Sequence, residues 1–135
     1  MVSVVPVEWG DQDSFGHVNN AVYFRWCETA RVHYLERIGV PVATPGDGIG
    51  PILAAIACNF RQPVTYPDTI YVGARVTRIG NSSFRMEHKL VSRSANVVVA
   101  DGDSTVVHLD YGRQKALPLP ESLRQAIARL EGRPI

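Results

Sequence analysis

The chain has 135 residues, a length typical of a single domain. Its 14 basic and 13 acidic residues nearly balance and 45% of its residues are hydrophobic, so the composition excludes a disordered chain and does not suggest nucleic-acid binding. The N-terminal residues lack the pattern of a signal peptide, and no apolar stretch approaches the roughly 20 residues that span a bilayer. We therefore expect one domain over residues 1–135, cytoplasmic and without a nucleic-acid or membrane partner.

The chain begins with a predicted strand and loop. Residues 2–9 are β-branched and partly alternating, which indicates a strand. Pro6 places this strand at a sheet edge or delays its start, because proline has no N–H to give to a neighbouring strand. Residues 10–20 are rich in turn-forming residues and predict an ordered loop.

A long helix is predicted next. Apolar residues recur at steps of three and four between Ala21 and Ile38, which is the helical period. Asn19 or Asn20 can serve as its N-cap, and Gly39 is a plausible stop. Apolar side chains occupy much of its circumference, so the helix is expected to be buried on more than one side.

The rest of the chain is predicted to be mainly β-structure. After a Pro/Gly-rich loop over residues 41–51, the candidate strands are residues 52–60, 69–79, 83–92 and 96–111, and residues 118–130 resemble a short helix. Consecutive strands joined by tight turns imply an antiparallel sheet. The long helix can bury its apolar surface only against the concave face of that sheet, which predicts an α+β fold with a curved antiparallel sheet of about five strands around a long central helix.

Cysteines and most histidines of the chain give no sign of a metal site. Cys27 and Cys58 are far apart in sequence without metal-ligand spacing, and we expect both to be reduced and buried. His33, His88 and His108 also lack ligand spacing. Neither a metal nor a cofactor is expected.

Residues 11–31 carry the most informative motif, DQDSFGHVNNAVYFRWCETAR. The pattern Asp-x-Asp-x-x-Gly-His-Val-Asn-Asn-x-x-Tyr, followed by an aromatic-rich helix ending in Glu-x-Ala-Arg, resembles the signature of the 4-hydroxybenzoyl-CoA thioesterase and acyl-CoA thioesterase group of hotdog proteins. The later segments NFRQPVTYPDTIYV and VTRIGNSSFRMEH agree with the same family. The resemblance implies a hotdog fold and the hydrolysis of an acyl-CoA to a free acid and coenzyme A.

The resemblance also implies two catalytic groups. The second Asp of the family's motif is its catalytic carboxylate, which corresponds to Asp13, and the backbone N–H near Asn20 corresponds to the group that polarises the carbonyl. A carboxylate can activate water as a general base or attack the thioester directly to give a mixed anhydride, and a helix N-terminus stabilises the negative oxygen that develops. From spacing alone, a role for Asp13 in capping a turn is equally expected.

The other residues of the loop each allow two roles. Asp11 is expected to brace the loop. His17 orients Asp13 or a water molecule, or it satisfies loop carbonyls. Gly16 provides a positive φ or a close approach for the substrate, Asn19 is a cap whose amide can also touch the thioester, and Tyr23 lines the acyl pocket or packs in the core.

Charged residues outside the loop are predicted to act in structure and binding. Glu28 and Arg31 are three residues apart and can pair on the helix surface. Cationic groups near the mouth of the pocket would bind the phosphates of coenzyme A, although most of the candidates would instead cover solvated strand faces; they are Arg61, Arg75, Arg78, Arg85 and Arg93.

Two other functions remain open alternatives. The same fold hosts enoyl-CoA hydratases and dehydratases, and Asp13 with His17 could form their proton-shuttling pair. A non-catalytic module that binds acyl-CoA or acyl-carrier protein is the second alternative. Whichever of these functions applies, a sheet with an open edge and an apolar face predicts a homodimer or homotetramer.

Overall fold

The computed structural model describes residues 1–41 and 48–135, so the predicted loop over 41–51 lies mostly outside the described residues. The strands are β1 (Val2–Pro6), β2 (Ile49–Phe60), β3 (Thr69–Ile79), β4 (Ser83–Ser92), β5 (Val97–Asp110) and β6 (Lys115–Ala116). The helices are the short 3-10 helix η1 (Trp9–Asp11), α1 (Asn20–Arg37) and α2 (Glu121–Glu131).

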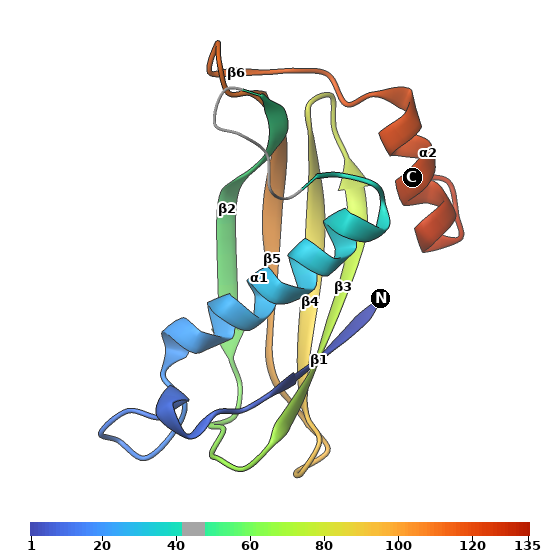
Figure 1. The fold of residues 1–135 in the computed structure, drawn as a ribbon. Coiled ribbons are helices and arrows are strands. Elements are labelled where there is room, and N and C mark those ends of the chain that lie inside the picture. The colour runs from blue at the N-terminus through green and yellow to red at the C-terminus, as the bar shows by residue number, and fades with distance from the viewer. Residues whose placement is uncertain (42–47) are drawn as a thin grey trace.

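The strands form one antiparallel sheet in the order β1-β3-β4-β5-β2, with β6 paired to β5. The sheet curves around α1, which crosses its concave face, while α2 lies beside the far end of α1 (Figure 1). This confirms the predicted hotdog architecture of the α+β class. The short strand β6 was missed, because two residues carry no recognisable pattern.

Three predicted boundaries differ from the structure by three residues. The first strand was expected over residues 2–9 but ends at Pro6, because residues 9–11 turn into η1, where the Glu8 N–H donates to the Asp11 carboxylate at 2.8 Å. The strand expected from residue 52 begins at Ile49. The last helix begins at Glu121 rather than residue 118, with Pro120 as its N-cap.

Helix α1 buries one broad face rather than several. Its fully buried apolar residues lie on successive turns that face the sheet; they are Tyr23, Trp26, Cys27, Ala30, Tyr34 and Leu35. Arg25, Glu28 and Glu36 lie on the opposite face and are exposed. The prediction of burial on more than one side was therefore wrong, because the sheet covers only about half of the helix circumference. Burying each large apolar side chain stabilises the fold by about 1.5–3 kcal/mol.

A small polar cluster lies inside the core beneath α1. Arg31, expected on the helix surface, is only 6% exposed, and its Nη1 has no hydrogen-bond partner among the described residues. The expected place of Arg31 on the helix surface is therefore wrong, although the charge of Glu28 still opposes the lowering of the Arg31 pKa by burial. His88 Nε2 lies 3.0 Å from Ser104 Oγ, and burial together with the positive charge of Arg31 lowers the pKa of His88 to about 4. The ring of His88 is neutral at pH 7.

Lowering the pH is expected to destabilise the protein through His88. Its pKa is about 4 in the folded state and 6.5 in the unfolded state, so the unfolded chain binds a proton that the native chain does not. The stabilisation is full above pH 6.5 and is lost as the pH falls towards 4, by roughly 3 kcal/mol at about 1.4 kcal/mol per pKa unit. Urea denaturation of wild type and His88→Gln across this pH range should show a steeper loss for the wild type; parallel pH profiles would contradict the burial of a neutral ring.

The close approach of β2 and β5 requires glycine at position 102. A Cβ atom there would lie 2.2 Å from the Ala57 carbonyl oxygen. We expect Gly102→Ala to lower the free energy of unfolding by about 1–3 kcal/mol or more, because the two strands must separate. Gly10→Ala is the matched control, since a Cβ at that position would have no atom within 4 Å. Urea titrations that showed equal stabilities for both variants would contradict this strand spacing.

Candidate active site

The loop before α1 closes on itself. Gln12 forms a β-bridge with Val18, the Asp13 N–H donates to the His17 carbonyl at 3.0 Å, and the Gly16 N–H donates to the Asp13 carbonyl at 3.1 Å. Gly16 has a φ of 87°, as predicted, and no atom lies within 4 Å of a Cβ at this position. The turn therefore requires glycine for its positive φ and not for a close contact within the chain.

Buried polar contacts fasten this loop to the body of the protein. The buried Asp11 accepts a hydrogen bond from Arg25 Nη2 at 2.8 Å and, through its backbone carbonyl, from the Asn19 N–H at 3.0 Å. The Val18 N–H donates to the Val64 carbonyl at 2.8 Å. The expected bracing role of Asp11 is confirmed, and the loop has a defined position relative to the start of α1.

The first backbone N–H of α1 is unpaired. The Asn19 side chain accepts from the Ala21 N–H at 2.9 Å and its carbonyl accepts from the Val22 N–H at 2.9 Å, so Asn19 is the N-cap. The Asn20 N–H has no hydrogen-bond partner in the part of the chain that the structure describes. This N–H lies at the positive end of an 18-residue helix, where it can bind a negatively charged oxygen.

A cavity of about 220 Å³ lies at this helix start. The loop, the first turn of α1 and the segment after β2 form its wall, which consists of His17, Val18, Asn20, Tyr23, Phe60, Arg61, Gln62 and Pro63. Of the predicted site residues, His17, Asn20 and Tyr23 line the cavity. Asp13, Gly16 and Asn19 belong to the same loop but are not part of this wall.

The Asp13 carboxylate has one oxygen in a turn and one oxygen free. Oδ1 accepts the Phe15 N–H at 2.9 Å, which is the turn-capping contact that spacing alone allowed. Oδ2 makes no hydrogen bond with any residue of the described ranges, and the side chain is half-buried. The turn holds the carboxylate through Oδ1 and leaves Oδ2 available for water or substrate.

The side chains of His17 and Tyr23 differ in their exposure and in their contacts with the rest of the chain. The His17 side chain is exposed and has no hydrogen bond within residues 1–41 and 48–135, so it does not satisfy loop carbonyls. Tyr23 is buried, donates its hydroxyl to the Gln62 carbonyl at 3.2 Å and packs edge-on against Phe60 with ring centroids 5.1 Å apart. Tyr23 therefore both lines the cavity and packs in the core.

Arg61 was a candidate for phosphate binding at the mouth of the pocket, but the rest of the segment from Phe60 to Pro63 was not predicted to line the site. It lies about 40 residues from the loop in sequence, and only the pairing of β2 at the sheet edge brings it to the start of α1. The sequence Arg-Gln-Pro after a predicted strand indicates that the strand ends there. It does not indicate that this strand end lies next to the loop before α1.

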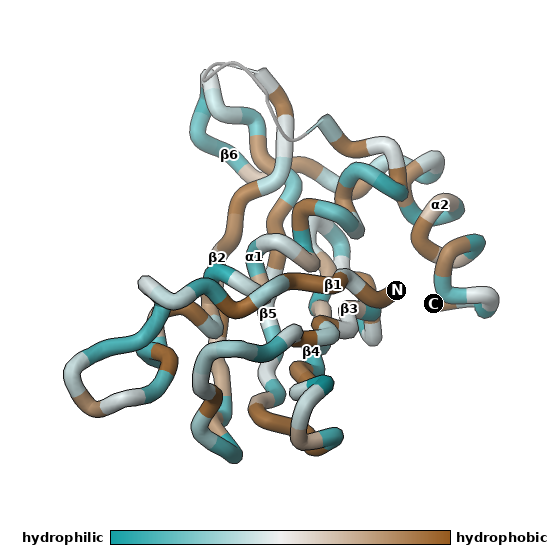
Figure 2. The backbone as a smooth tube through the Cα atoms, turned by 60° about the horizontal axis from the view of Figure 1, so that its bottom comes forward, coloured by the Kyte–Doolittle hydropathy of each residue, from teal (hydrophilic) through white to brown (hydrophobic). Residues whose placement is uncertain are grey.

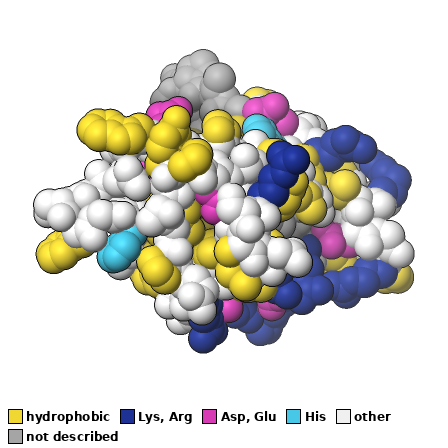
Figure 3. Space-filling view, turned by 90° about the horizontal axis from the view of Figure 1, so that it is seen from below, with side chains coloured by type: hydrophobic (Ala, Val, Ile, Leu, Met, Phe, Trp, Pro, Cys, Tyr) yellow, Lys and Arg dark blue, Asp and Glu magenta, His cyan; other side chains and the backbone are white. Residues whose placement is uncertain are grey.

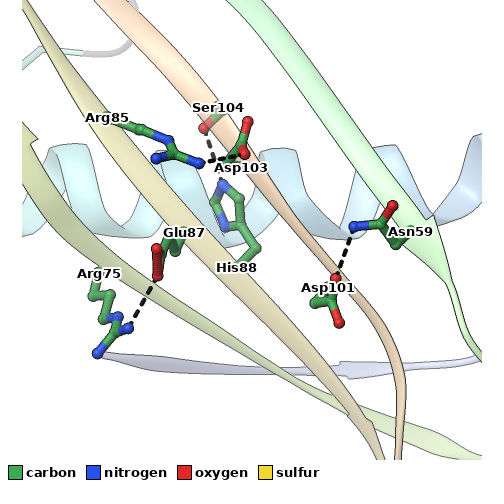
Figure 4. A network of polar contacts seen from close by, with 8 residues as sticks. All are labelled: Asn59, Arg75, Arg85, Glu87, His88, Asp101, Asp103 and Ser104. Atoms are coloured by element: carbon green, nitrogen blue, oxygen red, sulfur yellow. Dashed lines mark hydrogen bonds and ion pairs between the residues drawn. The ribbon is translucent and has the colours of Figure 1, made fainter.

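Three of the arginines considered for phosphate binding are already in ion pairs: Arg75 and Arg85 lie on the outer face of the sheet, away from α1, and Arg61 lies on the wall of the cavity at α1. Figure 4 shows part of this network, and Figure 3 shows basic and acidic side chains side by side along its lower rim. The ion pairs are Arg61–Asp101 at 3.0 Å, Arg75–Glu87 at 3.0 Å and Arg85–Asp103 at 2.7 Å. The Arg75–Glu87 and Arg85–Asp103 pairs line a hollow of about 590 Å³ that is larger than the cavity at α1, whereas Arg61 lines the cavity at α1 itself. Because Arg75, Glu87, Arg85 and Asp103 in its lining already form ion pairs with one another, and because the loop before α1 does not reach it, we do not assign the reaction to this hollow.

The cysteines do not offer a nucleophile. Cys27 is buried as predicted, and burial raises its pKa to about 12. Cys58 is only half-buried, contrary to prediction, because it lies on the edge strand β2. Among the described residues, no three His, Cys, Asp or Glu side chains gather in a way that could hold a metal ion. None of the helices in this part of the chain is both long and apolar enough to cross a membrane.

Comparison with known proteins places this geometry in context. Residues 7–127 match the model of the thioesterase-like superfamily. The long-chain acyl-CoA thioesterase FadM of Escherichia coli is 28% identical over 118 residues, which span 87% of this chain and 89% of that protein. A Thermus thermophilus thioesterase solved with coenzyme A and zinc is 34% identical with a TM-score of 0.88, over 99% of this chain and 96% of that one. A gentisyl-coenzyme A thioesterase is 26% identical with a TM-score of 0.84, over 95% of this chain and 100% of that one.

Substitution of Asn19 tests how much the N-cap of α1 contributes to the stability of the protein. Asn19→Ala deletes the oxygen that accepts the Ala21 N–H, and we expect it to lower the free energy of unfolding by about 1 kcal/mol. Asn19→Ser keeps an accepting oxygen and should retain most of this stability. Urea titrations of the three proteins measure the difference; an alanine variant as stable as wild type would contradict the cap.

Proposed function

The chain belongs to the thioesterase-like superfamily, and we propose that it hydrolyses an acyl-CoA to a free acid and coenzyme A at the start of α1. The observation that carries this proposal is the unpaired Asn20 N–H at the positive end of α1, on the wall of a cavity. In the proposed reaction this N–H binds the thioester carbonyl oxygen and stabilises its negative charge in the transition state. The names of FadM and of the gentisyl-coenzyme A enzyme support the substrate class.

Asp13 is the proposed catalytic carboxylate. As a general base, it takes a proton from water while the water oxygen bonds to the carbonyl carbon; the C–S bond then breaks and the coenzyme A thiolate leaves and is protonated. As a nucleophile, its oxygen bonds to the carbonyl carbon, the thiolate leaves, and water hydrolyses the resulting anhydride. The free Oδ2 supports either route, and the turn contact of Oδ1 holds the group in place.

The remaining loop residues have supporting roles in this proposal. The exposed His17 on the cavity wall orients the attacking water or Asp13, and Tyr23 lines the pocket for the acyl group. Gly16 and Asn19 bind substrate through the backbone and amide that they present beside the cavity. These roles require the loop to keep its closed shape, which the Asp13–His17 and Gly16–Asp13 hydrogen bonds support.

The proposed enzyme is a homodimer, or a tetramer built from such dimers, that pairs through β2. This strand ends the sheet, and its outer edge has no partner among the described residues. Its 12 residues include no charged side chain, and Figure 2 shows it as largely hydrophobic. Ile49, Ile52, Leu53 and Phe60 are 52%, 39%, 40% and 40% exposed. A long, uncharged and apolar edge is a surface that proteins ordinarily cover, and a second β2 is a matching partner.

Asp13→Asn is expected to lower the rate of thioester hydrolysis by at least about a hundredfold, the scale of general acid–base catalysis. The amide oxygen of asparagine can still accept the Phe15 N–H, so the turn and the affinity for acyl-CoA should be retained. The measurement is release of free thiol from a panel of short, long and aromatic acyl-CoA substrates. The panel also identifies the preferred acyl group.

Asp103→Asn is the matched control, because Asp103 lies on the outer face of the sheet and pairs with Arg85. It should keep the wild-type rate. Equal rates for the Asp13 variant and wild type would remove Asp13 from the mechanism. Loss of enoyl-CoA absorbance without thiol release would instead assign a hydratase, and binding without either reaction would assign a binding module.

A further inference from the structure

A second cavity lies at the end of α1 that is remote from the catalytic loop. Its volume is about 440 Å³, within the range of small-molecule sites, and its walls are the end of α1, the start of β2 and α2. Helix α1 has 18 residues, and at 1.5 Å per residue it separates this cavity from the loop by roughly 27 Å. None of the residues proposed for catalysis lines it, so a ligand held here is bound outside the reaction site.

Helix α2 forms its wall of the cavity with one stripe of side chains. Ser122, Ala126 and Arg129 follow one another at steps of four and three residues, so they lie on the same side of the helix, and all three line the cavity. Ala126, in the middle of the stripe, contributes only a methyl group. The small side chain at this position leaves the space between α2 and the end of α1 open.

The packing of α2 holds this wall in place. Ile127 is fully buried on the side of α2 that faces the core. The Glu131 carboxylate accepts hydrogen bonds from the Tyr34 hydroxyl and, at 3.1 Å, from the Val76 N–H. The cavity is therefore a preformed space between fixed elements, and a ligand does not have to move α2 in order to enter it.

Most of the cavity wall is hydrocarbon. The side chains of Ile38, Val40, Ile49 and Leu123 line it from three different elements. Ile49 is 52% exposed, so part of this apolar surface is in contact with water. Covering apolar surface releases free energy in proportion to the area removed from water, so the cavity favours a ligand with an apolar body.

The polar groups of the cavity are hydrogen-bond donors with a single positive charge. Arg129 is the one charged side chain in the lining, and it makes no hydrogen bond or ion pair with any residue of the described ranges. His108 is half-buried, and burial lowers its pKa, so near pH 7 its ring is neutral and carries one N–H. No Asp or Glu lines the cavity. A monoanion therefore matches its charge, and a guanidinium can direct two N–H groups at one carboxylate.

We propose that the cavity between α1, β2 and α2 is a second ligand site, which binds a free carboxylic acid with an apolar body. The carboxylate contacts the Arg129 guanidinium and the His108 ring N–H. The hydrocarbon part lies against the apolar side chains that α1, β2 and α2 contribute. Such acids are the chemical class that the proposed hydrolysis releases, but the site depends only on the geometry of one chain, and it requires neither the reaction nor a second copy.

Isothermal titration calorimetry of the wild-type protein with matched probes tests the class of ligand. Octanoate carries both the charge and the apolar body, acetate keeps only the charge, and octan-1-ol keeps only the apolar body. Octanoate should bind at least about tenfold more tightly than either of the other two, because only octanoate uses both parts of the cavity. Benzoate is the arm that distinguishes an aromatic from an aliphatic acid, and tight binding of either acid supports the site.

Two substitutions locate the bound acid. Ala126→Trp fills the cavity and should weaken octanoate binding at least about tenfold, whereas Gln125→Trp adds the same side chain on the exposed side of α2 and should not change it. Arg129→Gln should weaken octanoate binding at least about fivefold and leave octan-1-ol binding unchanged, because only the charged contact is lost. Arg133→Gln removes the same charge outside the cavity and is its control. Arg129 is exposed, so its variant remains informative if the tryptophan variant does not fold.

The outcomes separate this inference from the proposed function. Octanoate binding that is unchanged in Arg129→Gln, or no binding of octanoate and benzoate by the wild type, overturns the site. Octan-1-ol binding as tight as that of octanoate overturns the assignment to a carboxylic acid. Because binding is measured without any reaction, absence of thiol release from every acyl-CoA overturns the proposed function and leaves the evidence for this site unaffected.

Discussion

The backbone N–H of Asn20 is the constraint on which the candidate site depends. A helix leaves its first N–H groups without partners inside the helix. Here Asn19 satisfies the next two donors, of Ala21 and Val22, and leaves Asn20 free at the helix end where the macrodipole adds positive charge. The preceding loop, closed by the φ of Gly16 and braced by the buried Asp11, holds Asp13 in a turn seven residues before that donor.

The sheet gives this helix end its position and its neighbours. Tyr23 packs between Trp26 and Phe60, so the first turn of α1 lies against the end of the edge strand β2. The far end of α1 is tied to α2 through Tyr34 and Glu131. One helix thus has a polar cavity at its start and an apolar cavity at its end, and the open edge of β2 runs past both.

The regular elements were predictable because their patterns are local. The alternation in β3 and β4 and the three- and four-residue steps of α1 gave boundaries within about one residue, and the Asn19 cap follows from residue type. Arg31 was misplaced because charge suggests the surface, whereas its helical position faces the sheet. The wall from Phe60 to Pro63 depends on contacts between distant segments, and neither periodicity nor a local motif reports such contacts.

The most direct test of the central claim is a crystal structure with a coenzyme A analogue in which a methylene replaces the leaving sulfur and the carbonyl is retained. The account predicts that the carbonyl oxygen lies about 3 Å from the Asn20 nitrogen, with the Asp13 carboxylate across the carbonyl carbon. A carbonyl bound elsewhere, with the Asn20 N–H still unpaired, would contradict it.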